Sequence, residues 1–217
     1  MTKHDIAIVG GGLAGRIAAL NRKLEALVAG TSASVLYVID TKGLTIAASN
    51  WREPSSFVGS DYAFRAYFSG AIENGRAEHF ALGNVSGRPG LYISHRVDDA
   101  AGRPLGVVVV KAEFDQLESD WRDALRPTFV ADENGVVLVT SIPSWRFMSL
   151  GTASQEALSQ VRSSRQFGEE MLLPLPIVSG DRLSENARLV ETALPGGTRE
   201  GFVEVGLPVP STAWSLN

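Results

Sequence analysis

An internal repeat is the feature that most restricts what this 217-residue chain can fold into. Residues 35–51 (VLYVIDTKGLTIAASNW) recur as residues 128–145 (TFVADENGVVLVTSIPSW), with Asp40 and Asp132 92 positions apart. In each copy an apolar run leads into Asp-x-x-Gly, at Asp40 and at Asp132, and a second apolar run follows. Aspartate supplies a side-chain acceptor for a turn and glycine tolerates a positive φ, so each copy predicts a β-hairpin. Two copies of one unit are therefore expected in tandem.

The predicted domain boundaries follow from this repeat. Residues 1–20 form an atypical N-terminal segment, residues 21–126 a first unit with an N-terminal helix, and residues 127–217 a second unit that begins at Pro127. Most of the remaining sequence indicates paired strands with few helices, which is typical of an α+β fold with antiparallel sheets. The apolar residues of the predicted helix 16–29 are spaced three and four apart and predict an amphipathic face through which the protein forms a homodimer.

Composition excludes several classes of protein. The net charge is −4 and the sequence contains no run of lysine or arginine residues. Both features argue against a nucleic-acid partner. The chain contains no cysteine, so disulfides and thiolate metal sites are excluded. No apolar run reaches the 18 or so residues of a membrane span, so any membrane anchoring is expected from segments outside this sequence.

A glycine motif near the N-terminus offers a different interpretation. Residues 10–15 (GGGLAG) match GxGxxG between an apolar run at residues 5–9 and the predicted helix, and Asp40 would be the acid that binds a ribose. This pattern predicts a flavin- or nicotinamide-dependent oxidoreductase fragment as the alternative function. Against it, the rest of the chain lacks the alternation of strands and helices that a dinucleotide fold requires, and Asp40 is already explained as a hairpin residue.

Polar and aromatic side chains crowd into residues 56–68 (SFVGSDYAFRAYF). Residues 62–74 are predicted to be helical, which would place Tyr62 and Arg65 on one face, suited to hold an anion. Two later segments could close such a pocket, a predicted strand at residues 90–97 and an apolar run that ends in a lysine. The predicted ligand-binding residues are Tyr62, Arg65, Tyr67, Tyr92, Ser94 and Lys111. Each also has an ordinary explanation, as a solvated helix residue, a core aromatic or a strand end.

Catalytic and metal-binding patterns do not assemble in this sequence. The three histidines, His4, His79 and His95, are far apart, and no HExxH or GxSxG motif or phosphate-binding loop accompanies them. No catalytic residue, no metal site and no cofactor is therefore predicted.

Five segments together resemble the periplasmic sensor region of four-carbon-dicarboxylate transport sensor histidine kinases. They are NRKLEAL, VIDTKGLTIAASNWREPSSFVGSDYAFRAYF, HFALGNVSGRPGLYISHRV, GVVVVKAEFDQLE and ADENGVVLVTSIPSWRF. The resemblance implies a double Cache (PDC) fold, in which a long N-terminal helix lies beside two PAS-like antiparallel sheets. It also implies a non-enzymatic sensor domain on the periplasmic side of the bacterial inner membrane. Succinate, fumarate or malate would bind in the first, membrane-distal unit, at the same six residues.

Overall fold

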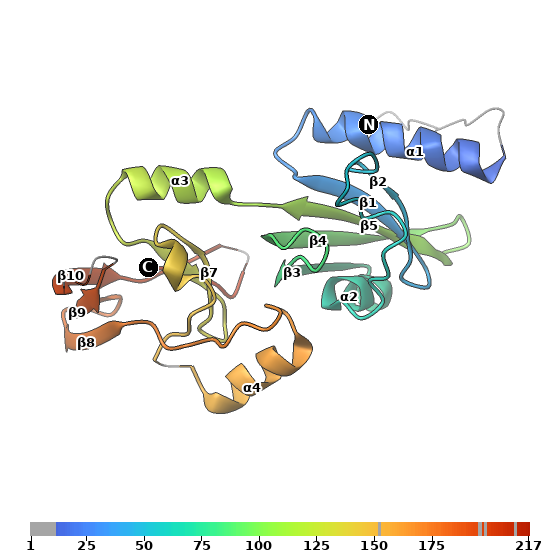
Figure 1. Ribbon diagram of the computed structural model, residues 1–217. Helices are drawn as coiled ribbons and strands as arrows, with labels where there is room; N and C mark the ends of the chain where they lie inside the picture. The colour runs from blue at the N-terminus through green and yellow to red at the C-terminus, as the bar shows by residue number, and fades with distance from the viewer. Residues whose placement is uncertain (1–11, 152, 195–196, 198, 211) are drawn as a thin grey trace. The chain divides into compact units, whose positions relative to one another are not determined.

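The computed structural model describes residues 12–151, 153–194, 197, 199–210 and 212–217 (Figure 1). Its contacts divide the chain into two compact units, Met1–Glu113 and Phe114–Asn217. The division falls before the boundary expected at Pro127, so residues 114–126 count with the second unit. A physical reason is that Glu118 binds residues of the second unit, where its side chain accepts a hydrogen bond from the backbone N–H of Thr140.

The first unit is a five-stranded sheet with two helices. Its elements are α1 (Leu13–Val28), β1 (Val35–Asp40), β2 (Thr45–Ala48), α2 (Ala66–Asn74), β3 (Arg76–Leu82), β4 (Pro89–Asp98) and β5 (Pro104–Ala112). The strand order is β2-β1-β5-β4-β3 and every neighbouring pair is antiparallel. Helix α1 packs against β1 and β2, and α2 packs against β3, β4 and β5 (Figure 1). The predicted α+β class with antiparallel pairing is confirmed here.

The core of the first unit lies between the sheet and α2. Alternate residues of β1 are buried, as the two-residue period of a strand requires, and Tyr37 and Ile39 point into the core. Val107 and Val109 of β5 and Phe68 of α2 join the same buried cluster. The apolar run at the end of β5 is therefore explained by packing, whereas the lysine that follows it needs a different explanation.

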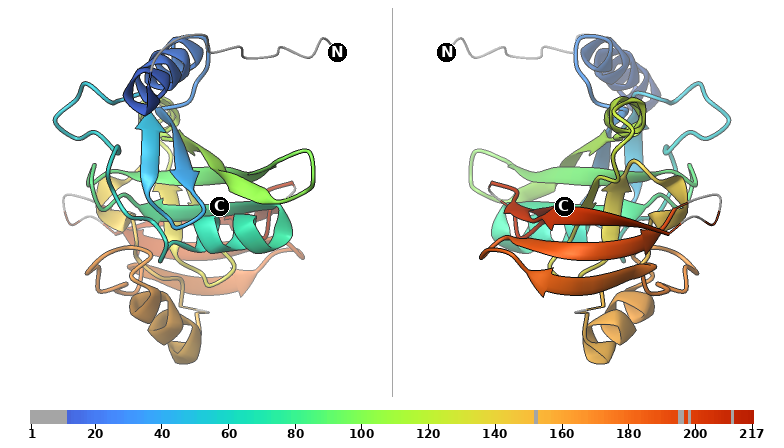
Figure 2. Two further views of the ribbon diagram at one scale, coloured as in Figure 1. Left: turned by 90° about the vertical axis from the view of Figure 1, so that its right-hand side faces the viewer. Right: turned by 90° about the vertical axis from the view of Figure 1, so that its left-hand side faces the viewer.

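The second unit contains two smaller sheets. Its elements are α3 (Asp115–Asp123), β6 (Phe129–Ala131), β7 (Val137–Thr140), η1 (Pro143–Trp145), α4 (Gln155–Ser164), β8 (Ile177–Arg182), β9 (Ala187–Ala193), β10 (Arg199–Val205), β11 (Leu207–Pro208) and β12 (Ser215–Leu216). One sheet has the order β11-β12-β6-β7. The other has the order β10-β9-β8, and its orange to red strands lie side by side in Figure 2. The segment 150–168 contains α4, which begins where the Ser154 hydroxyl accepts a hydrogen bond from Ala157 N.

The two repeated hairpins have the same local geometry. Asp40 Oδ1 accepts hydrogen bonds from the backbone N–H groups two and four residues later, at 2.8 and 3.0 Å. Asp132 Oδ1 does the same at 2.9 and 2.8 Å. Gly43 and Gly135 follow with φ of 96° and 73°, which a residue with a Cβ rarely adopts. The predicted hairpins are therefore confirmed, and Asp40 is a turn residue.

The structure also bears on the dinucleotide alternative. Residues 1–11, which include the apolar run 5–9 and the first two residues of the glycine motif, lie outside the described residues. Strand β1, however, has antiparallel neighbours on both edges, β2 and β5. A dinucleotide-binding fold would need a parallel partner beside β1, and both positions are occupied. Among the residues described, no helix is both long enough and apolar enough to cross a membrane.

Candidate ligand-binding site

All six sequence-predicted ligand residues lie in the interior of the first unit. None of them exposes more than 6% of its surface. Two of them, Arg65 and Lys111, carry full positive charges, and burial of a charge is costly unless an opposite charge or several hydrogen bonds compensate it. What surrounds these two cations therefore decides what the interior of this unit can bind.

The prediction that Tyr62 and Arg65 lie on one face of a helix is wrong. Helix α2 begins at Ala66, and Arg65 precedes it with φ −82° and ψ 132°, an extended conformation. Arg65 N donates to Tyr62 O at 3.0 Å, so the two residues belong to a turn. The turn is held because Tyr62 N donates to Gly43 O at 2.8 Å, which ties this segment to the first hairpin. Both side chains are nonetheless buried, through tertiary contacts rather than helical periodicity.

Arg65 is a buried guanidinium with unused hydrogen-bonding capacity. Its Nη2 donates to the backbone oxygen of Leu82 at 2.9 Å and to Asn84 Oδ1 at 3.4 Å. Its Nε is buried and, among the residues described, has no hydrogen-bond partner. Within that part of the chain no carboxylate forms an ion pair with Arg65 either. An anion would therefore supply what this side chain lacks.

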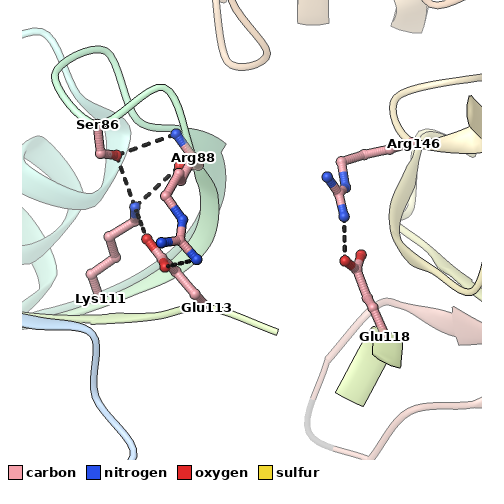
Figure 3. Close-up of polar contacts among 6 residues, drawn as sticks. All are labelled: Ser86, Arg88, Lys111, Glu113, Glu118 and Arg146. Carbon is pink, nitrogen blue, oxygen red and sulfur yellow. Dashed lines mark hydrogen bonds and ion pairs between the residues drawn. The ribbon is translucent and has the colours of Figure 1, made fainter. Parts of the chain in front are cut away.

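Lys111 lies at the end of β5 with its side chain fully buried, and Figure 3 shows its surroundings. Its Nζ donates to Glu113 Oε1 at 2.5 Å, Ser86 Oγ at 3.0 Å and the backbone oxygen of Arg88 at 3.1 Å. The other carboxylate oxygen of Glu113 pairs with Arg88 Nη2 at 2.9 Å. Burial lowers the pKa of Lys111, and its hydrogen bond and charge interaction with Glu113 oppose that shift.

One connection contacts both cations. The last residue of β3 and the connection from β3 to β4 give Leu82 O and Asn84 Oδ1 to Arg65, and the same connection gives Ser86 Oγ and Arg88 O to Lys111. Glu113 was not among the residues predicted from the sequence. A signal existed, because Glu113 follows Lys111 by two residues and side chains two apart in an extended segment lie on the same side.

The predicted tyrosines form an aromatic cluster beside the cations. The rings of Tyr67 and Tyr92 are stacked with centroids 4.8 Å apart, and the hydroxyl of Tyr37, which the sequence analysis did not select, donates to the hydroxyl of Tyr67 at 2.9 Å. Burial raises the pKa values of Tyr62, Tyr67 and Tyr92 above the ordinary tyrosine value. These phenols therefore remain neutral at physiological pH and can act as hydrogen-bond donors.

Ser94 uses its hydroxyl for contacts within the fold. Its Oγ lies 2.8 Å from the backbone oxygen of Tyr67 and 2.9 Å from that of Ala77. A hydroxyl has a single proton to donate, and here two backbone acceptors compete for it. Ser94 thus joins β4 to α2 and β3, and its contact with a ligand stays a prediction.

His79, on β3, is the described histidine with the strongest electrostatic perturbation. Burial, and secondly the charge of Arg65, lower the pKa of His79 to about 4, so the imidazole is neutral at pH 7. In the described part of the chain, no group of three or more histidine, aspartate or glutamate side chains is arranged to hold a metal ion.

Two surface grooves of about 650 and 900 Å³ lie along β8, β9 and β10 in the second unit. None of the six predicted residues lines them. The larger groove contains Arg182 and Arg188, but Arg188 is paired with Glu204 and Arg182 donates to the backbone oxygens of Ser184 and Glu185. For a small anion, the buried cations of the first unit are the more suitable partners.

Comparison with known proteins places this geometry in a family. No family model matches the chain. The C4-dicarboxylate transport sensor protein DctB of Rhizobium meliloti (strain 1021) is 51% identical over 197 residues, which is 91% of this chain and 32% of the relative. DctB of Pseudomonas aeruginosa (strain PAO1) is 32% identical over 162 residues, 75% of this chain and 26% of the relative. The chain thus spans about a third and about a quarter of the lengths of these curated relatives.

A solved structure covers the same region. The crystal structure of the sensor domain of the Vibrio cholerae histidine kinase DctB superimposes with a TM-score of 0.80 at 30% identity. The match covers 94% of this chain and 78% of that one. It confirms both the family resemblance seen in the sequence and the double Cache (PDC) fold. The chain belongs to the DctB family of histidine-kinase sensor domains, and it is an extracytoplasmic, ligand-binding domain of the periplasm.

Proposed function

We propose that this domain recognises small dicarboxylates such as succinate, fumarate or malate in its first unit, and that it signals across the membrane to a histidine kinase module. The observation that carries this proposal is the pair of buried cations, Arg65 and Lys111, in one compact unit. Arg65 in particular has no carboxylate partner among the described residues and keeps a buried, unpartnered Nε.

Two cations match the chemistry of a diacid. A four-carbon dicarboxylate has two separated negative charges, and leaving either one desolvated and unpaired would be costly. Arg65 offers a planar fork for bidentate contact with one carboxylate, while Lys111 offers a compact charge for the other. Each charge-assisted hydrogen bond contributes about 1.5–3 kcal/mol. Two such bonds to Arg65 and one to Lys111 therefore contribute about 4.5–9 kcal/mol, and the upper end of this range corresponds to micromolar binding.

The neighbouring groups are suited to orient such a ligand. Neutral hydroxyls of Tyr62, Tyr67 and Tyr92 would donate hydrogen bonds to the carboxylates. In the present structure the cations are covered by oxygens of residues 82–88 and by Glu113. Carboxylate oxygens of the ligand would replace several of these, so binding requires the segment between β3 and β4 to move.

The second unit is proposed to relay the signal rather than to bind the dicarboxylate. It repeats the hairpin of the first unit but has no counterpart of the Tyr62-x-x-Arg65 pattern or of Lys111. We further propose that the domain forms a homodimer through α1, where Leu27 is 47% exposed, and that segments beyond this chain anchor it in the membrane. A crystal grown with succinate that held it in the second unit alone would contradict the division of roles.

Calorimetry with a panel of organic acids tests the binding proposal. Succinate, fumarate and malate should bind and should raise the melting temperature, because a ligand that binds the native state alone stabilises it by mass action. Butyrate, which has one carboxylate on a four-carbon chain, is the matched control and should bind at least about tenfold more weakly. Equal binding of butyrate and succinate, or no binding of any diacid, would contradict the proposal.

A further inference from the structure

Glu113 occupies a position that the proposed function does not explain. Its carboxylate bridges two cations, with Oε1 on Lys111 Nζ at 2.5 Å and Oε2 on Arg88 Nη2 at 2.9 Å (Figure 3). Its side chain is 13% exposed and that of Lys111 is fully buried. A carboxylate of this chain therefore already holds the cation that the proposed function, on which this inference rests, gives to a carboxylate of the ligand.

Charge decides how the two carboxylates share Lys111. Without ligand, the carboxylate of Glu113 pairs with both Lys111 and Arg88. If a carboxylate of the ligand takes Lys111 while Glu113 keeps Arg88, Lys111 and Glu113 each still face an opposite charge. Displacing Glu113 from Lys111 then leaves neither residue as an unpaired buried charge. Arg88, with a side chain 56% exposed, can follow the moving carboxylate.

We propose that Glu113 is a built-in competitor of the ligand, whose carboxylate occupies Lys111 in the empty protein and is displaced by a carboxylate of the dicarboxylate. The exchange breaks one ion pair within the chain and forms one with the ligand. The affinity for the ligand therefore depends on the difference between the Lys111–ligand and Lys111–Glu113 interactions. Glu113 thus weakens binding and makes release of the ligand easier.

The place of Glu113 in the chain gives the exchange a consequence. Glu113 is the last residue of the first unit, Phe114 is the first of the second, and α3 begins at Asp115. The ion pair with Lys111 fixes the chain at this border in the empty protein. When a ligand takes Lys111, Glu113 loses that attachment one residue before the second unit begins.

The substitution Glu113→Gln tests this inference, because it keeps the shape of the side chain and removes its charge. We expect the variant to bind succinate roughly tenfold more tightly than wild type in calorimetry, since the competing charged hydrogen bond is lost. Asp99→Asn is the matched control. It removes a carboxylate that pairs with Arg103 at 2.8 Å between β4 and β5, at the opposite end of these strands from Lys111, and should leave the affinity unchanged.

Each outcome separates the inference from the proposed function. If wild type binds succinate and a folded Glu113→Gln variant, checked by circular dichroism, binds it equally or more weakly, the competitor is rejected and the binding proposal stands. If neither protein binds any dicarboxylate, both fail. If the variant does not fold, a crystal structure of wild type with succinate decides. Glu113 turned away from Lys111 supports the exchange, and Glu113 still bound to Lys111 overturns it.

Discussion

The two units share an ion pair between helix and hairpin, but the pair is exposed in one unit and largely buried in the other. In each, a glutamate from the helix before the repeated hairpin pairs with an arginine after it. In the first unit, Glu25 of α1 lies 3.5 Å from Arg52, and the two side chains are 45% and 61% exposed. In the second, Glu118 of α3 pairs with Arg146, and the exposures are 5% and 25% (Figure 3).

The helices also bind the hairpins in the same way. Asn21 Oδ1 of α1 accepts a hydrogen bond from Ala48 N at 2.9 Å, at the end of β2. Glu118 Oε1 accepts one from Thr140 N at 3.1 Å, at the corresponding end of β7. The repeated unit is therefore a helix followed by a hairpin, and α3 is to the second unit what α1 is to the first. In the second unit a single glutamate performs both tasks.

The difference shows where each unit places buried charge. The second unit buries a glutamate that is paired within the unit. The first unit leaves its helix pair in solvent and buries Arg65 and Lys111 instead, one without a carboxylate partner among the described residues. A buried pair fixes a structure, whereas a buried cation without a carboxylate partner leaves a place for an anionic ligand. This contrast can be tested by substitution in both units.

Breaking the helix pair should affect the units very differently. Glu118→Ala leaves Arg146 unpaired and removes an acceptor from Thr140 N, so we expect a loss of about 3 kcal/mol in the free energy of unfolding of the second unit. Glu25→Ala, its counterpart in solvent, should cost less than about 1 kcal/mol. Urea unfolding followed by tryptophan fluorescence measures both, and equal losses would remove the contrast.

Removing a cation of the first unit should affect binding more than folding. Arg65→Ala and Lys111→Ala should each weaken succinate binding about ten- to a hundredfold or more, because a charge-assisted hydrogen bond is lost. Arg52→Ala, an exposed arginine of the same unit, is the control and should bind as wild type does. Calorimetry decides, and a variant at Arg65 or Lys111 with wild-type affinity would remove that residue from the site.

The turn aspartate of the second unit should make its stability depend on pH. Burial raises the pKa of Asp132 to about 6, above its ordinary value of 3.8. The raised value means that its contribution to stability is complete below about pH 4 and is lost as the pH rises to about 6. Asp132→Asn should therefore add about 2 kcal/mol at pH 7 and little at pH 4. Asp40→Asn, at the more exposed turn, should add less, and an equal gain would argue against burial as the cause.

The first unit should show a smaller effect of opposite sign. The pKa of His79 is lowered to about 4, so its contribution is complete above about pH 6.5 and is lost as the pH falls toward 4. We expect wild type to lose about 1–2 kcal/mol there because of His79, after allowance for its partial exposure, and His79→Gln to lack this loss. His95→Gln, at an exposed position, is the control. Unfolding curves at pH 7 and pH 4.5 compare the three, and an unchanged slope in His79→Gln would contradict the prediction.

Local sequence patterns were sufficient for several features. Asp-x-x-Gly between apolar runs specifies a hairpin because its turn bonds form within five residues, so the turns at Asp40 and Asp132 could be predicted. The recurrence of that pattern gave the tandem organisation. Arg65 and Lys111 could be selected because charged residues inside apolar segments are unusual. The start of α2 was misplaced because residues 62–65 form a turn with Arg65 extended, and this turn is tied by Tyr62 N to Gly43 O, in a distant part of the chain.

The sequence by itself determined the family, the α+β class, the two hairpins and the identity of the buried cations. The tertiary structure alone decided what those cations contact. Arg65 reaches Leu82 and Lys111 reaches Ser86, partners 17 and 25 residues away in the chain, and Glu118 reaches Arg146 across 28 residues. Such contacts depend on strand register and on loop position, which are properties of the packed sheet. For that reason the role of α3 is seen only in the folded chain.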